Sequence, residues 1–581
     1  MGLGYEFAIL PTERNPNGRG TAGVEGQRDA NGCTAMGSIP LMILNSIFLI
    51  SVFGVPLEPK GSLPDAQFHD WYNTEHGPLR LRLPFVTNGF RFRATDGEKP
   101  EYVALYDITD MDELTQKTYL DLRTDLVKTE REKKTMAQID VGRKLYDLVD
   151  ELSSPAYRAL EDRADTDPET RGTVMIAVTT VTHPDPEKEA EHDRCRLFRT
   201  AAIDSAAPRE TLALHEYAPH NGLGGEAHKA AMSTPWRDRL VKDVVASKSR
   251  RTYQWYYTFG PAPRELASLA APDVIGPWAS NDGKTRTFPS ATRPAVESFI
   301  TTKDGVEIPY RLEGNTDPGA PVVVLSNSIL VNWNIWDRFV DVFLSRPQNQ
   351  KYRVVRYLTR GRHSASGEQP VNIDLLASDL ATLLEALRVA PKGARLIGVS
   401  LGGVTVLNAS LLYPERIAAF IACDTNSSAP ESNRKAWGDR VAMCEKEGAV
   451  DPTTKEPIVG EELAEATTRR WFVPESYETQ PEVLAPVKEA VRTNSLKGFV
   501  HSVQALCAYD IRERMASATV PGLFIAGAND GVLPQTMQKM AADLKGGAEL
   551  KIIDRAGHLP MVEQPASFAD VVTEFLGKID E

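Results

Sequence analysis

The sequence predicts two folded units: a C-terminal unit with a doubly wound, mostly parallel sheet, and an N-terminal unit of antiparallel strands with helices on one face. Three observations carry this prediction. After residue 296, short buried-strand runs alternate with amphipathic helices. Before residue 262, one pattern of strands and helices occurs twice. Between the two, prolines interrupt any regular period over 263–295, which indicates a linker.

The composition of the chain excludes several classes of function. The 581 residues contain 66 Lys and Arg against 79 Asp and Glu, a net charge of −13, which is the wrong sign for neutralising phosphates. We therefore expect neither nucleic acid nor a membrane as partner. The five cysteines form no C-x-x-C pair and the ten histidines no H-E-x-x-H pattern, so we expect a cytoplasmic protein without metal or cofactor. The sequence leaves open whether it forms a homo-oligomer.

The first 45 residues show neither a helical nor a strand period, and they predict a disordered or uncertain tail. An apolar run over 39–55 follows. It is shorter than the ~20 apolar residues of a membrane span and contains Asn45. Its second half predicts a buried strand.

The N-terminal unit spans 46–262, with copies at about 46–150 and 171–262. Its repeat is visible where Glu101–Asp107 aligns with Glu210–Glu216, an offset of 109 residues (210 − 101). The first copy predicts strands at 50–55, 90–94 and 102–108 and helices at 64–82 and 111–140. Antiparallel strands with helices on one face follow the ferredoxin-like plan.

The motif Phe68–Leu79 (FHDWYNTEHGPL) resembles that of dimeric α/β-barrel proteins of the EthD-like group. The resemblance implies that the two copies pair their sheets into one barrel. The aligned stretch of the second copy, 191–198, lacks the Trp-Tyr and the final His. The first copy therefore carries the candidate pocket, lined by His69, Trp71, Tyr72 and His76. The alternative is that these side chains cap a helix and fill a core.

The catalytic pattern lies in the C-terminal unit, 296–581. Gly398–Gly403 (GVSLGG) directly follows an apolar strand and precedes a helix, which is the context that a G-x-S-x-G nucleophile requires. Ser400 would stand on a sharp turn, clear of its neighbours. The turn also aims the Leu401 amide and the helix N-terminus at a developing oxyanion.

A base and an orienting acid follow in the order typical of hydrolases with this motif. Asp530 ends the strand at 522–526, and His558 follows the strand at 549–553. In parallel sheets both strand ends meet at one edge, so Asp530 can orient His558. Asp424, at the end of the strand at 417–421, is a rival for the orienting acid.

Residues 296–581 resemble the α/β-hydrolases, nearest the 3-oxoadipate enol-lactonase branch. The resemblance rests on Leu325–Ile329 (LSNSI), Gly398–Gly403 and Gly557–Pro565 (GHLPMVEQP). It implies that the Ile329 amide is the second oxyanion donor beside Leu401, and that Asn327, Ser328 and Leu330 contact the substrate. Leu330 stands where these lactonases usually carry Gly, and Leu358 where Asp is common. Both departures predict a reshaped acyl pocket.

An insertion over about 428–506 predicts a helical cap that excludes water from the site. Trp437, Trp471 and Phe472 are candidate wall residues, or they hold the cap helices together. The whole pattern predicts a serine hydrolase that cuts an ester or lactone of a small metabolite. The alternatives are hydrolysis of a carbon–carbon bond β to a ketone, or a metabolite-binding accessory protein with an inactive hydrolase half.

Overall fold

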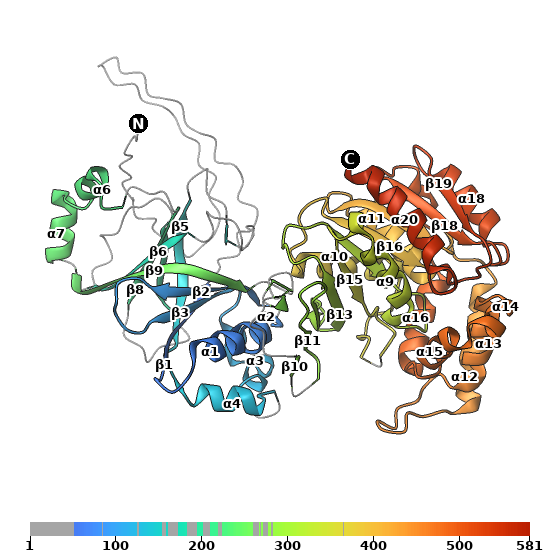
Figure 1. The fold of residues 1–581 in the computed structure, drawn as a ribbon, viewed down its shortest axis with the longest axis horizontal. Helices are drawn as coiled ribbons and strands as arrows, with labels where there is room; N and C mark the ends of the chain where they lie inside the picture. Colours follow the sequence, from blue (N-terminus) through green and yellow to red (C-terminus); the bar gives the residue numbers. More distant parts are fainter. Residues whose placement is uncertain are drawn as a thin grey trace, which may run out of the picture.

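The computed structural model describes residues 51–581 except 84, 125–126, 154–158, 161–171, 183–194, 202–209, 219–222, 244, 260–265, 268, 271–276, 281–282 and 364. The predicted tail at 1–45 and most of the second-copy motif, 191–194, lie outside the described residues. Two lobes stand side by side, the N-terminal one in blue to green and the C-terminal one in yellow to red (Figure 1).

The N-terminal lobe is a closed ring of antiparallel strands. The first half contributes strands in the order β2-β3-β1-β5 and the second half in the order β7-β8-β6-β9. The ring closes because β2 pairs with β9 and β5 with β7. The bounds are β1 (Ser51–Pro59), β2 (Val86–Ala94), β3 (Tyr102–Ile108), β5 (Lys144–Leu152), β6 (Val174–Thr182), β7 (Cys195–Thr200), β8 (Thr211–Tyr217) and β9 (Val245–Phe259). The short β4 (Ile139–Val141) extends β1 beside the ring.

Numbered within its own half, each set of strands has the order 2-3-1-4. The aligned segments of the repeat lie in β3 and β8, which hold equivalent places as the third strand of each half. Alternate side chains of the strands face inward and outward. One apolar cluster, which includes Phe92, Leu214 and Trp255, comes from one face of the strands, and another lies between the opposite face and the helices of the first half.

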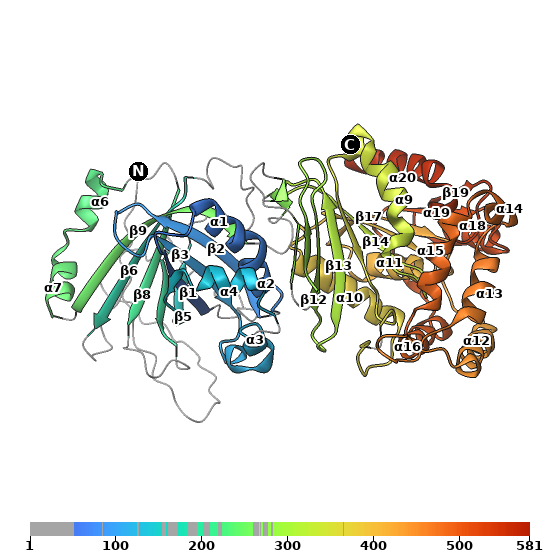
Figure 2. The ribbon, with the colours of Figure 1, turned by 60° about the horizontal axis from the view of Figure 1, so that its bottom comes forward.

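The helix predicted at 64–82 is a continuous helical stretch on the outside of the ring (Figure 2). It consists of α1 (Asp65–Trp71), the π-helical η1 (Tyr72–His76) and α2 (Gly77–Leu81). The single helix predicted at 111–140 is wrong. The segment forms η2 (Asp112–Thr115), α3 (Lys117–Asp121) and α4 (Glu130–Met136). Gln116 is extended and ends η2, and the Thr129 hydroxyl accepts from the Glu132 amide and starts a new helix.

The C-terminal lobe contains one sheet of order β10-β11-β12-β13-β15-β14-β16-β17-β18-β19. From β15 to β19 neighbouring strands are parallel, and β10 to β13 extend the sheet with antiparallel pairs. The parallel strands are β14 (Val322–Ser326), β15 (Arg353–Tyr357), β16 (Ala394–Val399), β17 (Ile417–Cys423), β18 (Gly522–Gly527) and β19 (Glu549–Ile553). The alternation of short strands and helices predicted after residue 296 is present in this part of the sheet.

Helices between these strands bury their apolar sides on the sheet. α10 (Ile373–Ala386) packs on α11 (Leu401–Leu412), and α9 (Asp337–Ser345) packs on α20 (Pro565–Asp580). The stretch predicted as a cap contains five helices, gathered at one end of the lobe (Figure 1): α12 (Asn433–Glu447), α13 (Glu461–Trp471), α14 (Pro474–Thr479), α15 (Pro481–Arg492) and α16 (Leu496–Cys507). Among the described residues, none of the helices has the length and apolar character needed to span a bilayer.

The segment predicted as a linker, 263–295, is more than a connection. Within it, β10 (Trp278–Ala279) pairs with β11 (Arg286–Phe288), and β11 pairs with β12 (Ala295–Thr301), whose other neighbour is β13 (Glu307–Gly314). Leu266 and Leu269 are buried in the core of the C-terminal lobe. The C-terminal lobe therefore begins about thirty residues before the predicted boundary at 296.

This boundary predicts a difference between two fragments. Residues 266–581 should unfold at a midpoint several degrees higher than residues 296–581, since burying one Leu side chain contributes about 1.5–3 kcal/mol. Circular dichroism melts of both fragments measure it. Equal midpoints would show that Leu266, Leu269 and the two short strands do not stabilise this lobe.

Candidate active site

Ser400 stands at the sharp turn between β16 and α11. Its backbone is left-handed, with φ 58° and ψ −117°, a conformation that costs a non-glycine residue free energy and that clusters at functional sites. Two hydrogen bonds hold the turn: the Ser400 amide donates to Cys423 O at 2.9 Å, and the Thr425 hydroxyl donates to Ser400 O at 2.7 Å. The strained turn is therefore fixed by β17 and the residues after it.

Two glycines of the turn, Gly398 and Gly402, allow its backbone to pack directly against neighbouring backbone. A Cβ on Gly398 would lie 2.1 Å from the backbone oxygen of Gly402, and a Cβ on Gly402 would lie 2.3 Å from that of Ser326. Because the obstacles are backbone atoms, neither clash can be relieved by a side-chain rotation. The G-x-S-x-G pattern is thus a packing requirement of this turn.

His558 lies on the loop after β19, beside Asp530 at the end of β18. Its Nδ1 is 2.6 Å from the Asp530 Oδ2, its amide donates to Trp471 O at 2.7 Å, and its ring stacks on the Trp471 indole with centroids 5.5 Å apart. Burial alone would raise the pKa of Asp530, but the contact with His558 leaves that pKa below its usual range. Asp530 is therefore charged at neutral pH and holds the imidazole in place.

Asp424, the rival acid, is in a different state. It is 1% exposed, with left-handed φ 43°, and its Oδ1 accepts from the Gly527 amide at 2.9 Å. Burial, and then the negative charge of Asp530, raise the pKa of Asp424 well above its ordinary value. The pKa values of these two adjacent carboxyl groups are thus shifted in opposite directions, which favours the charged form of Asp530 and the neutral form of Asp424.

The loop after β14 carries the predicted oxyanion residues. Within the described chain, the Ile329 and Leu401 amides have no hydrogen-bond acceptor. Asn327 is a support of the loop, because its Nδ2 donates to Tyr357 O at 2.7 Å and its Oδ1 accepts from Trp336 Nε1 at 2.9 Å. Leu330 has left-handed φ 71°, a conformation that a glycine adopts at lower free-energy cost.

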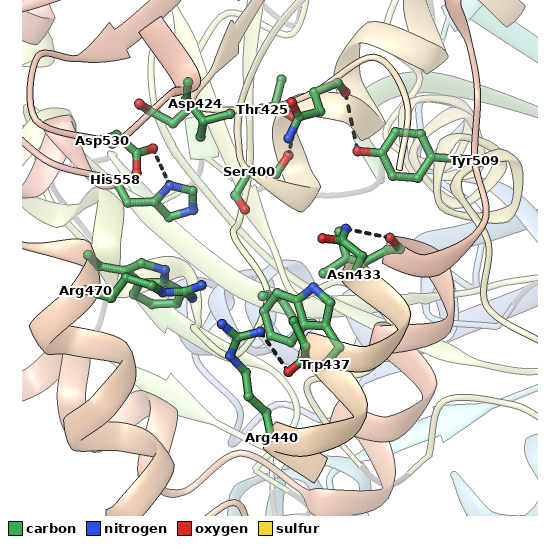
Figure 3. A pocket seen from close by; sticks show the side chains of 16 residues that line it. Ser400, Asp424, Thr425, Asn433, Trp437, Arg440, Arg470, Tyr509, Asp530 and His558 are labelled. Carbon is green, nitrogen blue, oxygen red and sulfur yellow. Dashed lines mark hydrogen bonds and ion pairs between the residues drawn. The ribbon is translucent and has the colours of Figure 1, made fainter. Parts of the chain in front are cut away.

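A cavity of about 230 Å³ lies between the sheet and the cap (Figure 3). Seven residues named in the sequence analysis line it: Ile329, Ser400, Trp437, Trp471, Asp530, His558 and the rival acid Asp424. Five do not: Asn327, Ser328, Leu330, Leu401 and Phe472. Phe472 follows the end of α13 in an extended conformation and is buried in the core of the lobe instead.

Two arginines of the cavity wall were not predicted from the sequence. Arg440 of α12 and Arg470 of α13 lie with their Cζ atoms 4.5 Å and 5.9 Å from the centroid of the Trp437 ring. In the described part of the chain, neither forms a salt bridge with a carboxylate. Arg440 is half-buried and Arg470 is exposed. The wall of the cavity thus carries two positive charges together with the candidate residues Ser400 and His558.

A helical spacing could have indicated these arginines. Arg440 comes three residues after Trp437, on the same side of α12, and Arg470 directly precedes Trp471. Charged residues on predicted helices usually face solvent, so the pattern carried no signal without the fold of the cap.

The candidate pocket of the N-terminal lobe is mostly filled. Trp71 Nε1 donates to Glu132 Oε2 at 2.6 Å, His76 Nδ1 lies 2.8 Å from Glu132 Oε1, and the Tyr72 hydroxyl bonds that of Tyr106 at 3.0 Å. Burial lowers the pKa of His76 to about 4. Trp71, Tyr72 and His76 are therefore core residues here, and only His69 keeps an unpaired buried atom, its Nδ1.

No cluster of three or more His, Cys, Asp or Glu residues suited to a metal ion occurs among the described residues.

Comparison with known proteins agrees with this geometry. Residues 318–571 match the family model "Alpha/beta hydrolase family", and they form an α/β-hydrolase domain. The chain is similar to 3-oxoadipate enol-lactonase 2 of Acinetobacter baylyi, at 28% identity over 47% of this chain and 94% of that protein. It is also similar to a putative carbamate hydrolase RutD of Stutzerimonas stutzeri, at 24% identity over 46% and 96%.

Among solved structures, the chain is similar to an enol-lactonase from Burkholderia xenovorans, with 26% identity, a TM-score of 0.43 and coverage of 48% of this chain and 99% of that one. A hydrolase from Pseudomonas aeruginosa shows 30% identity and a TM-score of 0.42, over 48% of this chain and 98% of that one.

The packing of the Ser400 turn predicts the effect of one methyl group. Gly402→Ala should lower the free energy of unfolding by about 1–3 kcal/mol or more, because its Cβ would meet backbone. Gly577→Ala, in α20 with open space around it, is the matched control and should be neutral or stabilise by up to about 1 kcal/mol. Urea unfolding of both variants measures the difference, and similar stabilities would refute the packing requirement.

Proposed function

We propose that the C-terminal lobe is a serine hydrolase that cleaves an ester or lactone of a small metabolite. The observation that carries the proposal is the strained Ser400 turn, which opens onto the same cavity as the bonded pair His558 and Asp530. For the fold alone, a glycine would adopt this backbone conformation at a lower free-energy cost than a serine. The serine at this position therefore indicates a chemical role. The names of the similar proteins, which include lactonases, support a substrate of this class.

The chemistry follows from the arrangement. His558 takes the proton of the Ser400 hydroxyl as its oxygen attacks the acyl carbon, and returns that proton to the leaving oxygen. The free amides of Ile329 and Leu401 stabilise the oxyanion of the tetrahedral intermediate. Water, deprotonated by His558, then releases the acyl group from Ser400. Asp530 stabilises the imidazolium that forms in each step.

The charges of the cavity favour a substrate that is itself an anion. Arg440 and Arg470 face the cavity without carboxylate partners in the described residues, so they can bind a carboxylate on the substrate. Because Arg440 is half-buried and Arg470 is exposed, such a pair is partly screened by solvent and gains mainly from its hydrogen bonds. We propose an ester or lactone with a free carboxylate.

For the N-terminal lobe we propose two tandem ferredoxin-like copies of the EthD-like kind, paired as one barrel. The order 2-3-1-4 in each half supports it, as does the equivalent placement of β3 and β8. Expression of residues 46–262 tests whether this barrel is a folded unit: a cooperative unfolding transition supports it, and a fragment without one contradicts it.

The assignment of the acid gives a sharp prediction. Ser400→Ala and His558→Ala should each lower kcat by at least about 10³-fold, and Asp530→Asn by about 10²–10⁴-fold. Asp424→Asn should cost less than tenfold, because the neutral acid and the amide both keep an oxygen for the Gly527 amide. Kinetics on an aryl ester measure all four. A crippling Asp424→Asn beside a nearly silent Asp530→Asn would refute the assignment.

The arginine pair predicts a selective loss of binding. Arg440→Gln and Arg470→Gln should each raise KM about tenfold or more for a mono-aryl ester of a dicarboxylic acid, since hydrogen bonds to charged groups are worth about 1.5–3 kcal/mol.

The matched neutral substrate, an aryl ester of a monocarboxylic acid with the same chain length, should change less than threefold in KM. If both substrates lose equally, the arginines support the fold of the cap and do not select the substrate. A panel of lactones, esters and β-diketones with wild type and Ser400→Ala then identifies the bond that is cut.

A further inference from the structure

Arg91 of β2 carries a buried charge that the described chain does not balance. The residue is 0% exposed, and its Nη1 donates to the side-chain oxygen of Asn73 at 2.7 Å. Its Nε and Nη2 have no hydrogen-bond partner, and no carboxylate of the described residues forms a salt bridge with it. Because a buried charge without an opposite charge costs several kcal/mol, this arrangement calls for an anion.

Its neighbours do receive carboxylates. Arg131 pairs with Asp70, and Arg80 lies 4.0 Å from Glu132, which also bonds His76 and Trp71. Among the described residues, carboxylates therefore lie beside Arg80 and Arg131, and none forms a salt bridge with Arg91. This difference separates Arg91 from the filled network of the predicted pocket.

Aromatic rings surround the guanidinium. Its Cζ lies 4.9 Å from the ring centroid of Phe68, 4.3 Å from that of Tyr72 and 4.9 Å from that of Tyr256. Cation–π contacts offset part of the desolvation cost. They leave the two N–H groups on the free edge unbonded, and they give that edge apolar walls.

Two further polar atoms lie in this cluster of rings. The Nδ1 of His69 is buried without a hydrogen bond, and the buried hydroxyl of Tyr256 has no hydrogen bond of good geometry but interacts with Arg91; the His69 and Tyr256 ring centroids are 5.4 Å apart. Burial, and then the charge of Arg91, lower the pKa of His69 to about 4, so the imidazole is neutral at pH 7. Unpaired donors and acceptors from α1, β2 and β9 therefore gather around one cation.

We propose that Arg91 anchors a second ligand site, in the N-terminal lobe, which binds a small organic carboxylate. Nε and Nη2 lie on one edge of the guanidinium and match the two oxygens of a carboxylate. The rings of Phe68, Tyr72 and Tyr256 contact the rest of the ligand, and His69 adds a neutral hydrogen bond. The free edge is covered by protein, so the ligand enters by displacing side chains and is small. This proposal does not depend on the proposed hydrolase activity.

The test is calorimetric titration of the full chain with acetate, butyrate and benzoate, with inorganic phosphate and chloride as separate arms. Because Arg440 and Arg470 also attract carboxylates, every titration is run in an Arg440→Gln, Arg470→Gln background. We expect saturable binding of a carboxylate with one site per chain. Arg91→Met should abolish it, and Arg91→Lys, which keeps the charge and loses the two-pronged edge, should weaken it about tenfold or more.

Hydrogen exchange locates the site. With a saturating carboxylate, amides of 86–94 and 253–259 should exchange more slowly in the parent and unchanged in Arg91→Met. The proposal is overturned if carboxylates do not bind, if only phosphate or chloride binds, if Arg91→Lys binds as tightly as its parent, or if protection is confined to 296–581.

Thermal melts check the fold of the variants. An Arg91 without its anion is a buried unpaired charge, so Arg91→Met should melt at or above the midpoint of its parent in carboxylate-free buffer. A large drop in the midpoint of both Arg91→Met and Arg91→Lys, with no rise of the parent's midpoint on adding carboxylate, would make Arg91 a structural residue and overturn the proposal.

Discussion

The close approach of backbone around Ser400 is the constraint on which the rest of the active site depends. Gly398 and Gly402 leave no room for a Cβ, since backbone oxygens would lie 2.1 Å and 2.3 Å away. This contact sets α11 against the end of β14, and so fixes the Leu401 amide relative to the loop that carries Ile329. A nucleophile and both proposed oxyanion donors are thereby held by main chain, which cannot rearrange as side chains do.

The two carboxyl groups at this edge of the sheet favour different charge states. Asp424 and Asp530 follow neighbouring strands, so a negative charge on both side chains would be repulsive. Only Asp530 has His558 as a partner that stabilises its charge. The neutral Asp424 holds the Gly527 amide, while a Cβ on Gly527 would lie 1.9 Å from Gly557 O. Asp424 therefore supports the contact between the loops that carry Asp530 and His558. Its place beside the pair is structural, although the sequence made it look like a rival.

The sequence was informative wherever local pattern and chemistry coincide. Apolar runs located the parallel strands, and strand-end positions located Ser400, Asp530 and His558. It failed where structure depends on distant contacts. β10 and β11 are two and three residues long, and they exist because β12 offers an open edge. Side-chain capping at Thr129 divides a stretch that its period predicted as one helix. Arg440 and Arg470 reach the cavity only because the cap folds over the sheet.

Both lobes contain arginines that lie beside aromatic rings without a carboxylate partner among the described residues. A guanidinium under protein is tolerated when carboxylates surround it, as for Arg360 between Asp304 and Asp379 in the core of the C-terminal lobe. Arg91, Arg440 and Arg470 lack such partners among the described residues, and each stands beside aromatic rings that cover its face but leave N–H groups free. Aromatic contacts keep an arginine in place without neutralising it. At Arg91, which is buried, an anion would form its pair in a medium of low dielectric, whereas solvent screens a pair with the half-buried Arg440 or the exposed Arg470.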